Sequence, residues 1–375
     1  LPLIKGKDMY DEWILPVNLI FKCYFFNVTN PDEVMEGNNP NLVEYGPFTY
    51  REVFEKQIVD VDEELDEIIY DVKSTFTFDK YASLNISKRD TVTILNPAYI
   101  GTISMASIIG FVVNHFTSKL YRKTNPKEIL FDGVKLTFII NVINNVKKYK
   151  IRYNLYISQR HPVNGTIRGR FSVNRGVNNI SELGNIGSYN GRRVQTIWRT
   201  EKCNTVRGSD TITWAPLINP MPSVLSFIPD LCSYQNMYRS IEADYDKEVS
   251  IYGLIGSRFV MRERTWFLNQ SQCYCLERNK VPNCLPQGLI DVSDCLQKVP
   301  IIMSEPHFLH GDPQLLMYAL GLNPSEDLHE TFIVIEPYTG TPLSGQKKIQ
   351  LNLKLERQPV DLLSNISEGY FPLLW

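Results

Sequence analysis

The chain has 375 residues, of which 43% are hydrophobic and 21% are charged, and its formal net charge is −2. This length and composition predict a globular protein, and residues 1–375 are expected to form one composite domain because no linker, repeat or low-complexity tract divides them. The near-neutral charge, without a clustered basic stretch, argues against nucleic acid as a partner.

Most predicted elements are β-strands. Runs of β-branched and aromatic residues predict strands over 18–28, 68–79, 135–143, 151–158 and 257–267. Segment 331–356 predicts two strands joined by a loop. In its second half, Ile349, Leu351, Leu353 and Leu355 are expected to face the core, and Gln350, Asn352, Lys354 and Glu356 to face water. The predicted fold class is therefore α+β and mainly β.

Helices are fewer, and they gather between residues 102 and 132. An apolar stripe at helical spacing predicts a helix over 102–121, formed by Met105, Ile108, Ile109, Val112, Phe116 and Leu120. Asn125 as N-cap, Pro126 next and Gly133 just past the end predict a second, short helix. A third is expected to begin after Asp312 and to end at Gly321.

The longest nearly uncharged apolar stretch covers residues 103–113. It is about half as long as the roughly 20 residues that cross a bilayer as a helix, so no part of the chain is expected to span a membrane. Because the chain opens on Leu1 without a methionine or a signal peptide, we expect a piece of a longer protein, with any anchor outside it.

Six of the seven cysteines lie within one hundred residues: Cys203, Cys232, Cys273, Cys275, Cys284 and Cys295. Zinc sites usually use cysteines two to four residues apart, and the C-x-C spacing of Cys273 and Cys275 fits them poorly. A bond between these two would close a small strained ring, so each is expected to have another partner. Of the 15 pairings that six cysteines allow, most stay open. Cys23, in an apolar stretch, is expected to be a buried thiol.

The N-x-S/T acceptor of N-glycosylation occurs six times, at Asn27, Asn85, Asn164, Asn179, Asn269 and Asn365. Each sequon alone is weak, but together with clustered cysteines that do not suit zinc they agree on an oxidising, secretory environment. Disulfides are therefore favoured over a metal site.

Common catalytic signatures are absent from the sequence: it has no G-x-S-x-G elbow, Walker loop, Rossmann fingerprint or H-E-x-x-H. His307 and His310 could share a metal on a helix, but the neighbouring Pro306 and Gly311 favour a turn. The acidic run at 60–67 lacks the ligand spacing of an EF-hand and is expected to be a solvated loop. We therefore predict neither an enzyme nor a metal site, and no cofactor.

Five motifs follow one another along the chain. "NPDEV" at 30–34 precedes "VEYGPFTYRE" at 43–52, and "CYC" at 273–275 precedes "PHFLHGDP" at 306–313 and the block at 321–343. Together they resemble the ectodomain of the class B scavenger receptor family, the CD36-like proteins. The resemblance extends over nearly the whole chain.

This resemblance implies a large antiparallel β-barrel-like core with short helices, a helical bundle at the membrane-distal apex, about residues 102–132, and an apolar tunnel through the core. It also implies a transmembrane helix beyond each end of the chain. The family's disulfides, carried onto matching positions, would join Cys203 to Cys273, Cys232 to Cys295, and Cys275 to Cys284.

The implied function is that of a membrane-anchored, non-enzymatic receptor. It would capture lipids, lipoproteins, sterols, carotenoids or lipidic pheromones and pass them through the tunnel to the membrane. The implied location is the extracellular side of the plasma membrane or, alternatively, the lumenal side of a lysosomal or endosomal membrane. The polar apex residues expected to attract anionic head groups are His115, Lys119, Arg122, Lys123 and Lys127. Their alternative role is that of a solvated helix face.

Two departures from the family pattern affect the ligand class. Members that bind modified lipoproteins carry clustered lysines where this chain has His115 and Thr117, and the lysosomal branch carries a histidine where this chain has Thr124. A lysosomal-type trafficking receptor that binds a protein cargo through its apex is the alternative function. A secreted hydrolase with unrecognised active-site residues is a third hypothesis.

Overall fold

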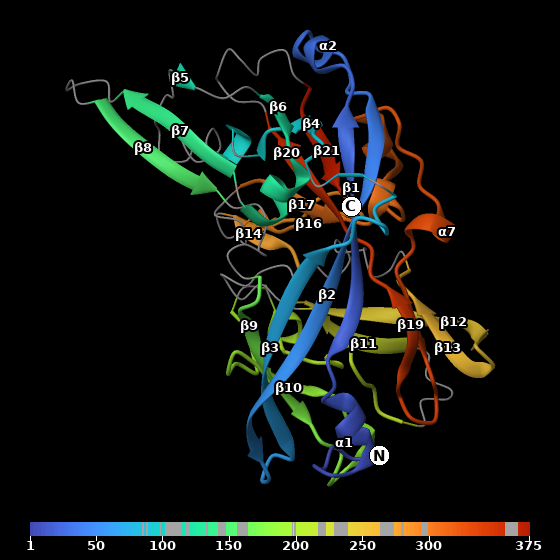
Figure 1. The fold of residues 1–375 in the computed structure, drawn as a ribbon. Coiled ribbons are helices and arrows are strands. Elements are labelled where there is room, and N and C mark those ends of the chain that lie inside the picture. The colour runs from blue at the N-terminus through green and yellow to red at the C-terminus, as the bar shows by residue number, and fades with distance from the viewer. Residues whose placement is uncertain are drawn as a thin grey trace.

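The computed structural model describes the chain except residues 85, 88, 98, 102–114, 117–119, 133, 142–147, 156–163, 197, 199, 217–222, 229–238, 263–273, 279–280, 294–298 and 357–366. Its described part is mainly β, as predicted, with two large antiparallel sheets and short helices (Figure 1).

The larger sheet has nine strands in the order β10-β9-β3-β2-β1-β21-β20-β17-β16. Their bounds are β1 Val17–Val28, β2 Leu42–Asp62, β3 Glu67–Phe78, β9 Ile167–Asn174, β10 Ile186–Tyr189, β16 Ile290–Asp291, β17 Ile301–Ser304, β20 Gln350–Leu355 and β21 Gly369–Leu374. The edge strands β10 and β16 do not pair with each other. Within the described residues, the expected barrel-like core is therefore an open sheet.

The smaller sheet has the order β11-β12-β13-β18-β19 and lies in the lower right half of the view in Figure 1. Its strands are β11 Ser223–Ile228, β12 Arg239–Ile251, β13 Leu254–Val260, β18 Phe332–Ile335 and β19 Pro342–Gln346. The long β2–β3 hairpin runs from the middle of the molecule to its lower end, where the N-terminus and α1 (Asp8–Trp13) lie.

Smaller elements complete the described fold. Three small sheets pair β4 (Val92–Leu95) with β6 (Tyr121–Thr124), β5 (His115–Phe116) with β7 (Val134–Asn141) and β8 (Lys148–Leu155), and β14 (Leu276–Arg278) with β15 (Val281–Asn283). The short helical elements are α2 Pro31–Met35, η1 Glu128–Asp132, η2 Ile180–Glu182, α4 Glu201–Asn204, η4 Pro306–Phe308, η5 Pro313–Met317 and α7 Glu326–His329. None of the helices in the described ranges has the length and hydropathy to span a membrane.

The largest apolar cluster joins the nine-stranded sheet to the segment around η1. Phe131 of η1 packs on Tyr50 of β2 and on Phe76 of β3, with ring centroids 4.7 and 5.7 Å apart. Val92 and Ile94 of β4 are buried in the same cluster. Burial of these side chains anchors β4, β6 and η1 to the sheet.

The helix predicted over 102–121 is wrong at its described residues. His115–Phe116 form β5, which pairs with β7, and Tyr121 begins β6, which pairs with β4. Residues 102–114 and 117–119 lie outside the described part. Apolar residues at helical spacing can also lie on the two faces of a short strand. Pairing with β4 and β7 therefore decided that these residues form strands instead of a helix.

The two shorter helices are confirmed in position. Asn125 Oδ1 accepts the backbone N–H of Lys127 at 2.8 Å before η1, and Asp312 Oδ1 accepts that of Gln314 at 2.9 Å before η5. The Asn125 carboxamide and the Asp312 carboxylate therefore both act as the predicted N-caps. The elements they begin are a π-helical turn and a 3₁₀-helix rather than α-helices.

Segment 331–356 forms three strands, β18, β19 and β20, rather than two. The polar face predicted for β20 is also wrong in part, because Gln350 and Asn352 are fully buried. Gln350 Nε2 donates to Asn352 Oδ1 at 2.8 Å, and Asn352 Nδ2 donates to Ser304 Oγ at 3.0 Å. The turn that contains η4 covers this face, so these amides are satisfied by protein groups instead of water.

Candidate functional site

The predicted apex residues whose side chains the structure describes lie on β6 and directly before η1. Arg122 forms an ion pair with Glu128, and Thr124 Oγ1 donates to the other carboxylate oxygen of Glu128 at 2.8 Å. Glu128 thus links β6 to η1 and balances the Arg122 charge. Thr124, at the position of the lysosomal branch's histidine, is buried.

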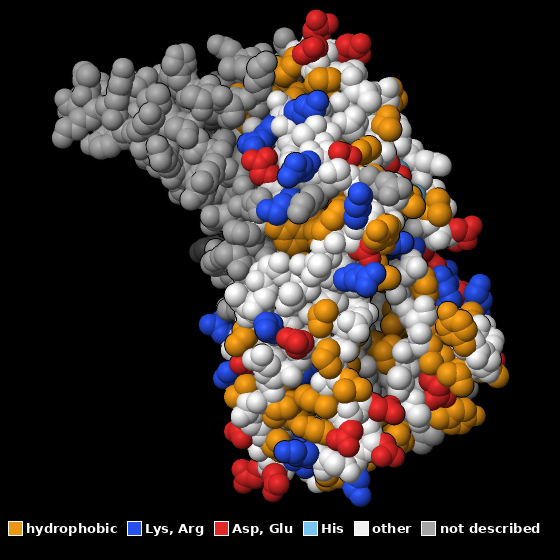
Figure 2. Space-filling view, viewed as in Figure 1, with side chains coloured by type: hydrophobic (Ala, Val, Ile, Leu, Met, Phe, Trp, Pro, Cys, Tyr) orange, Lys and Arg blue, Asp and Glu red, His pale blue; other side chains and the backbone are white. Residues whose placement is uncertain are grey.

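Lys123 and Lys127 are exposed beside this ion pair. Figure 2 shows Lys and Arg side chains gathered in the upper half of the visible face. Lys119 lies outside the described residues, and of His115 only the backbone position, in β5, is described. The structure thus brings Arg122, Lys123 and Lys127 together on one short stretch, but not on one helix face.

The disulfide between Cys275 and Cys284 is confirmed. Its sulfur atoms are 2.01 Å apart, and it closes the β14–β15 hairpin. Cys203 is also disulfide-bonded, but Cys232, Cys273 and Cys295 lie outside the described residues, so the other two pairings remain predictions. Cys23 is buried in the main core cluster, as predicted.

Three of the six sequon asparagines are described. Asn164 and Asn179 are exposed, and Asn27 is half-buried on β1. At Asn179, Oδ1 accepts both the backbone N–H and the hydroxyl of Ser181, at 3.1 and 2.8 Å, so the amide nitrogen points away from the sequon serine. Asn85, Asn269 and Asn365 fall outside the described ranges.

His307 and His310 lie in a turn, as predicted, and each imidazole contacts a different carboxylate. His307 Nε2 is 2.9 Å from Glu44 Oε1, and His307 Nδ1 accepts the backbone N–H of Asn323 at 2.9 Å. Since Nδ1 is an acceptor, Nε2 carries the proton and donates to Glu44. Among the described residues, no three side chains are grouped to hold a metal ion.

A second imidazole stacks on His307. The rings of His307 and His329 are 4.3 Å apart and nearly parallel, and His329 Nδ1 accepts the backbone N–H of Ser325 at 3.0 Å. Burial, together with the neighbouring His307, lowers the pKa of His329 to about 4. His329 is therefore held in a neutral form near neutral pH, and the Nδ1 atom of each ring accepts a backbone N–H.

Glu44 joins this histidine pair to the end of the chain. The indole N–H of Trp375 donates to Glu44 Oε1, the same oxygen that His307 contacts. Burial alone would raise the pKa of Glu44, but the hydrogen bonds from His307 and Trp375 lower it on balance. This contact ties β2 to η4, although Glu44 and His307 are 263 residues apart in the sequence.

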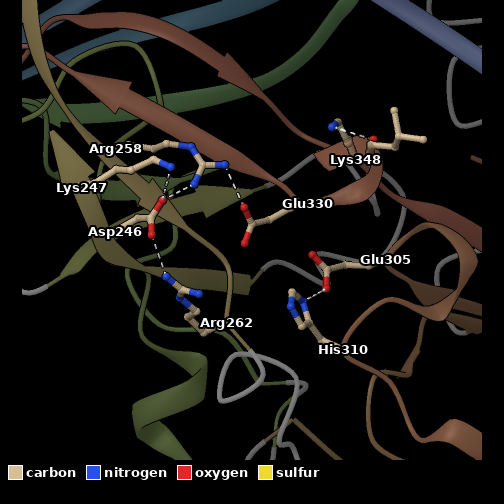
Figure 3. A network of polar contacts seen from close by, with 9 residues as sticks. Asp246, Lys247, Arg258, Arg262, Glu305, His310, Glu330 and Lys348 are labelled. Atoms are coloured by element: carbon tan, nitrogen blue, oxygen red, sulfur yellow. Dashed lines mark hydrogen bonds and ion pairs between the residues drawn. The ribbon is translucent and has the colours of Figure 1, made fainter. Parts of the chain in front are cut away.

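A deeper polar network surrounds Glu305, Glu330 and Arg258 (Figure 3). Glu305 is fully buried, and one of its oxygens lies 2.8 Å from His310 Nδ1. Burial raises the pKa of Glu305. The hydrogen bond between His310 and the Glu305 carboxyl group raises the pKa of His310. Arg258 bridges Glu330, at 2.8 Å, and Asp246. Arg258 and Arg262 balance Asp246 and Glu330, so these ion pairs join β12, β13 and the C-terminal segment.

Sequence reasoning did not find this network. Asp246 lies among other charged residues of β12, and Arg258 and Glu330, which complete its network, belong to other segments of the chain. The one sequence signal was the concentration of His307, His310 and His329 within a short C-terminal region rich in proline and glycine. That signal indicated a structured turn but not the partners Glu44 and Glu305.

Comparison with known proteins finds a family and relatives that match the whole length of the chain. The model of the CD36 family matches residues 1–375. The chain is 30% identical to sensory neuron membrane protein 2 of Manduca sexta, over 100% of this chain and 78% of that protein. It is 30% identical to sensory neuron membrane protein 1 of Apis mellifera, over 100% of the chain and 75% of that protein. The chain therefore belongs to the CD36 family.

Proposed function

We propose that this chain is the ectodomain of a membrane-anchored receptor that captures hydrophobic ligands and passes them to the membrane through an apolar tunnel. The observation that carries the proposal is membership of the CD36 family over all 375 residues, together with relatives named sensory neuron membrane proteins. Candidate ligands are lipids, lipoproteins, sterols, carotenoids and lipidic pheromones. The proposal includes no catalytic step.

The energetics of such a receptor depend on apolar burial. An acyl chain gains roughly 0.8 kcal/mol for each CH₂ that leaves water, so a continuous apolar conduit lets it reach the bilayer without a large barrier. The main core cluster is the largest apolar cluster of the described residues, and in it aromatic residues from β1, β2 and β3 pack with apolar side chains of β4 and η1. Polar groups concentrate elsewhere, around Glu44 and Glu305.

The exposed lysines beside η1 are proposed to aid the encounter with anionic ligands. Lys123 and Lys127 are exposed, and Arg122, which pairs with Glu128, is half-buried. Replacing both lysines by Glu is expected to slow association with anionic lipid particles, most strongly at low salt, where the Debye length is about 30 Å. The Arg122→Gln variant is the matched control. Equal association rates for wild type and the double variant would assign these lysines to a solvated surface.

The proposed location is the extracellular or lumenal side of a membrane, with transmembrane helices flanking the chain. The Cys275–Cys284 disulfide supports an oxidising compartment.

Peptide mapping without reductant is expected to recover Cys203 with Cys273 and Cys232 with Cys295. Glycosidase treatment of protein from a secretory host is expected to increase gel mobility, with sugar on at least three sequon asparagines. Other pairings, or unchanged mobility, would contradict these two predictions.

The decisive experiment is organic extraction of the purified protein followed by lipid mass spectrometry. A hydrophobic ligand that co-purifies at near-stoichiometric amount is the expected result. As a control, one aliquot is denatured and passed through size exclusion before extraction. The lipid that it retains is lipid bound non-specifically to exposed surfaces. An empty protein that binds a soluble enzyme tightly would support the trafficking receptor instead.

A further inference from the structure

One end of the five-stranded sheet carries an exposed apolar group that the proposed tunnel does not use. We call Tyr252, Leu254, Ile255 and Tyr338 the tip patch; their exposed fractions are 104%, 54%, 61% and 71%. Tyr252 lies in the β12–β13 turn and Tyr338 in the β18–β19 turn. Figure 2 shows hydrophobic side chains gathered at this lower right end of the molecule.

The strand register places both turns at the same end of the sheet. Ile251 pairs with Leu254 across the two-residue turn, and Ser257 of β13 pairs with Ile335 at the end of β18. Because β13 and β18 are antiparallel, the start of β13 and the turn after β18 project in the same direction. The four residues therefore lie at the same end of the sheet.

The tip patch is exposed on both faces of the hairpin. Leu254 and Ile255 are consecutive residues of β13, so their side chains point to opposite faces of the sheet. Both are nevertheless more than half exposed, whereas Gly256 and Ser257 immediately after them are buried. A partner protein that docks on one face of the sheet would cover only one of these two side chains, whereas a medium that surrounds the tip would cover both.

The backbone at Tyr252 does not explain why a tyrosine is there. Tyr252 has a φ of 49° and Gly253 a φ of 87°, a pair of left-handed residues in a two-residue hairpin turn. Asn-Gly is favoured in such turns, and a bulky aromatic residue in this conformation is uncommon. Tyr252 makes up no part of a buried cluster, so its side chain contributes little to the fold.

The neighbouring turn is rigid and presents Tyr338 outward. The Glu336 carboxylate accepts the backbone N–H groups of Tyr338, at 3.1 Å, and Thr339, at 2.8 Å. The backbone N–H of Trp214 donates to the carbonyl of Gly340 at 2.9 Å. Glu336 is thus used inside the turn, and residues 249–257 of the other hairpin contain no charged side chain.

We propose that the tip patch inserts into the interface of a phospholipid bilayer. This inference rests on the proposed function, in which the receptor acts beside a membrane. Tyrosine is enriched at the bilayer interface, and Leu and Ile gain free energy by entering the acyl region from either face of the hairpin. The absence of charge over 249–257 leaves no ionised side chain of the β12–β13 hairpin to be dehydrated on insertion, and the Glu336 carboxylate beside Tyr338 is hydrogen-bonded within its own turn.

The test measures binding of the chain to phosphatidylcholine vesicles by flotation. The triple variant Tyr252→Asn, Leu254→Thr and Ile255→Thr is expected to lower the partition coefficient at least about tenfold. The matched control, Val43→Thr with Leu320→Thr, removes exposed apolar side chains elsewhere and is expected to change it less than about twofold. Equal binding by the wild type and the triple variant would overturn the inference.

A second measurement reports insertion directly. Tyr252→Trp fluorescence is expected to be quenched by bromine-labelled lipids, whereas the same reporter in Val43→Trp is not. Unquenched Tyr252→Trp would also overturn the inference. Reversible self-association that the triple variant abolishes would assign the tip patch to a second copy of the chain instead.

Failure of this inference is distinguishable from failure of the proposed function. The triple variant is expected to bind a fluorescent sterol in solution as the wild type does, because the tip patch is remote from the main core cluster. Wild-type protein that binds no sterol or other lipid contradicts the receptor proposal, and the vesicle measurements then still report on the tip patch alone.

Discussion

Two buried polar clusters contact the long strand β2, one in each half, and they differ in whether charged groups lie inside the core. The lower cluster joins α1 to the sheet near the N-terminus. The ammonium of Lys56 donates to the carbonyl of Trp13 and lies 4.8 Å from the Trp13 ring centroid. Close by, the Tyr70 hydroxyl donates to Asp210 at 2.6 Å. This cluster therefore contains a cation and a carboxyl group inside the core.

The upper cluster joins the start of β2 to the C-terminal segment through Glu44, His307, His329 and Trp375. Its His329 imidazole is neutral near pH 7, and its single carboxylate is about one-third exposed to solvent. The upper cluster is thus built from hydrogen bonds and ring stacking, with its one charge at the edge of the core.

The comparison shows how burial decides the cost of charge. In the lower cluster, burial raises the pKa of Asp210 and lowers that of Lys56 to about 8, so their mutual attraction does not recover the cost of dehydration. In the upper cluster, burial disfavours the protonated form of His329. The lower cluster should therefore be sensitive to substitution, and the upper cluster to acid.

The largest expected effect is that of Asp210→Ala in the lower cluster. It leaves the buried Tyr70 hydroxyl and the backbone N–H of Ile212 without their acceptor. We expect a loss of about 3 to 5 kcal/mol in the free energy of unfolding, measured by denaturant titration. The control Asp210→Asn keeps an acceptor and is expected to cost less than half as much. Equal costs would show that charge, not hydrogen bonding, is what the site requires.

Lys56→Met tests whether the cation and the carboxyl group act as a pair. The variant removes the hydrogen bond to Trp13 and the attraction to Asp210, and we expect a loss of about 2 to 3 kcal/mol. Combined with Asp210→Asn, the two losses should be less than additive by at least about 0.5 kcal/mol. Strict additivity in the double-mutant cycle would mean that the two groups are energetically independent.

Acid should weaken the upper cluster through His329. The unfolded chain binds a proton at this imidazole below about pH 6.5, whereas the folded chain binds it only near pH 4. The free energy of unfolding is therefore expected to fall by about 2 to 3 kcal/mol as pH decreases from 6.5 to 4. His329→Asn keeps an acceptor for the Ser325 N–H and should remove most of this slope.

His310→Asn is the matched control for His329. The pKa of His310 is raised, so its stabilising contribution is complete below pH 6.5 and is lost as pH rises through the folded value. The control variant should therefore keep the acid-dependent loss. An unchanged slope in His329→Asn would assign the acid sensitivity to other groups.

The smallest expected effect is that of Trp375→Phe. The change removes the indole N–H that donates to Glu44 but keeps an aromatic ring to stack on Tyr24, whose centroid lies 4.4 Å from that of Trp375. Because water reaches Glu44, we expect a loss of only about 0.5 to 1 kcal/mol in the free energy of unfolding. A loss above about 2 kcal/mol would contradict this small contribution and show that the indole, which Phe does not replace, matters more than one solvent-accessible hydrogen bond.

Local patterns predicted the elements whose partners lie nearby in the sequence. The strands at 18–28 and 68–79 and the N-caps Asn125 and Asp312 were correct, because alternation and capping depend on a few adjacent residues. The Cys275–Cys284 disulfide followed from the family resemblance and closes a short hairpin. The order of motifs along the chain was also sufficient to identify the family.

Other features depended on contacts that no local pattern encodes. Gln350 and Asn352 alternate with apolar residues as a solvated face would, but the turn of His307 covers them, and His307 N–H donates to Gln350 Oε1 at 2.7 Å. Phe116 belongs to the stripe at helical spacing but pairs as part of a strand with β7, and Tyr121, at the end of the predicted helix, pairs with β4. Hydrophobic spacing states which residues avoid water; only the tertiary structure decides which neighbours exclude that water and which polar groups replace it.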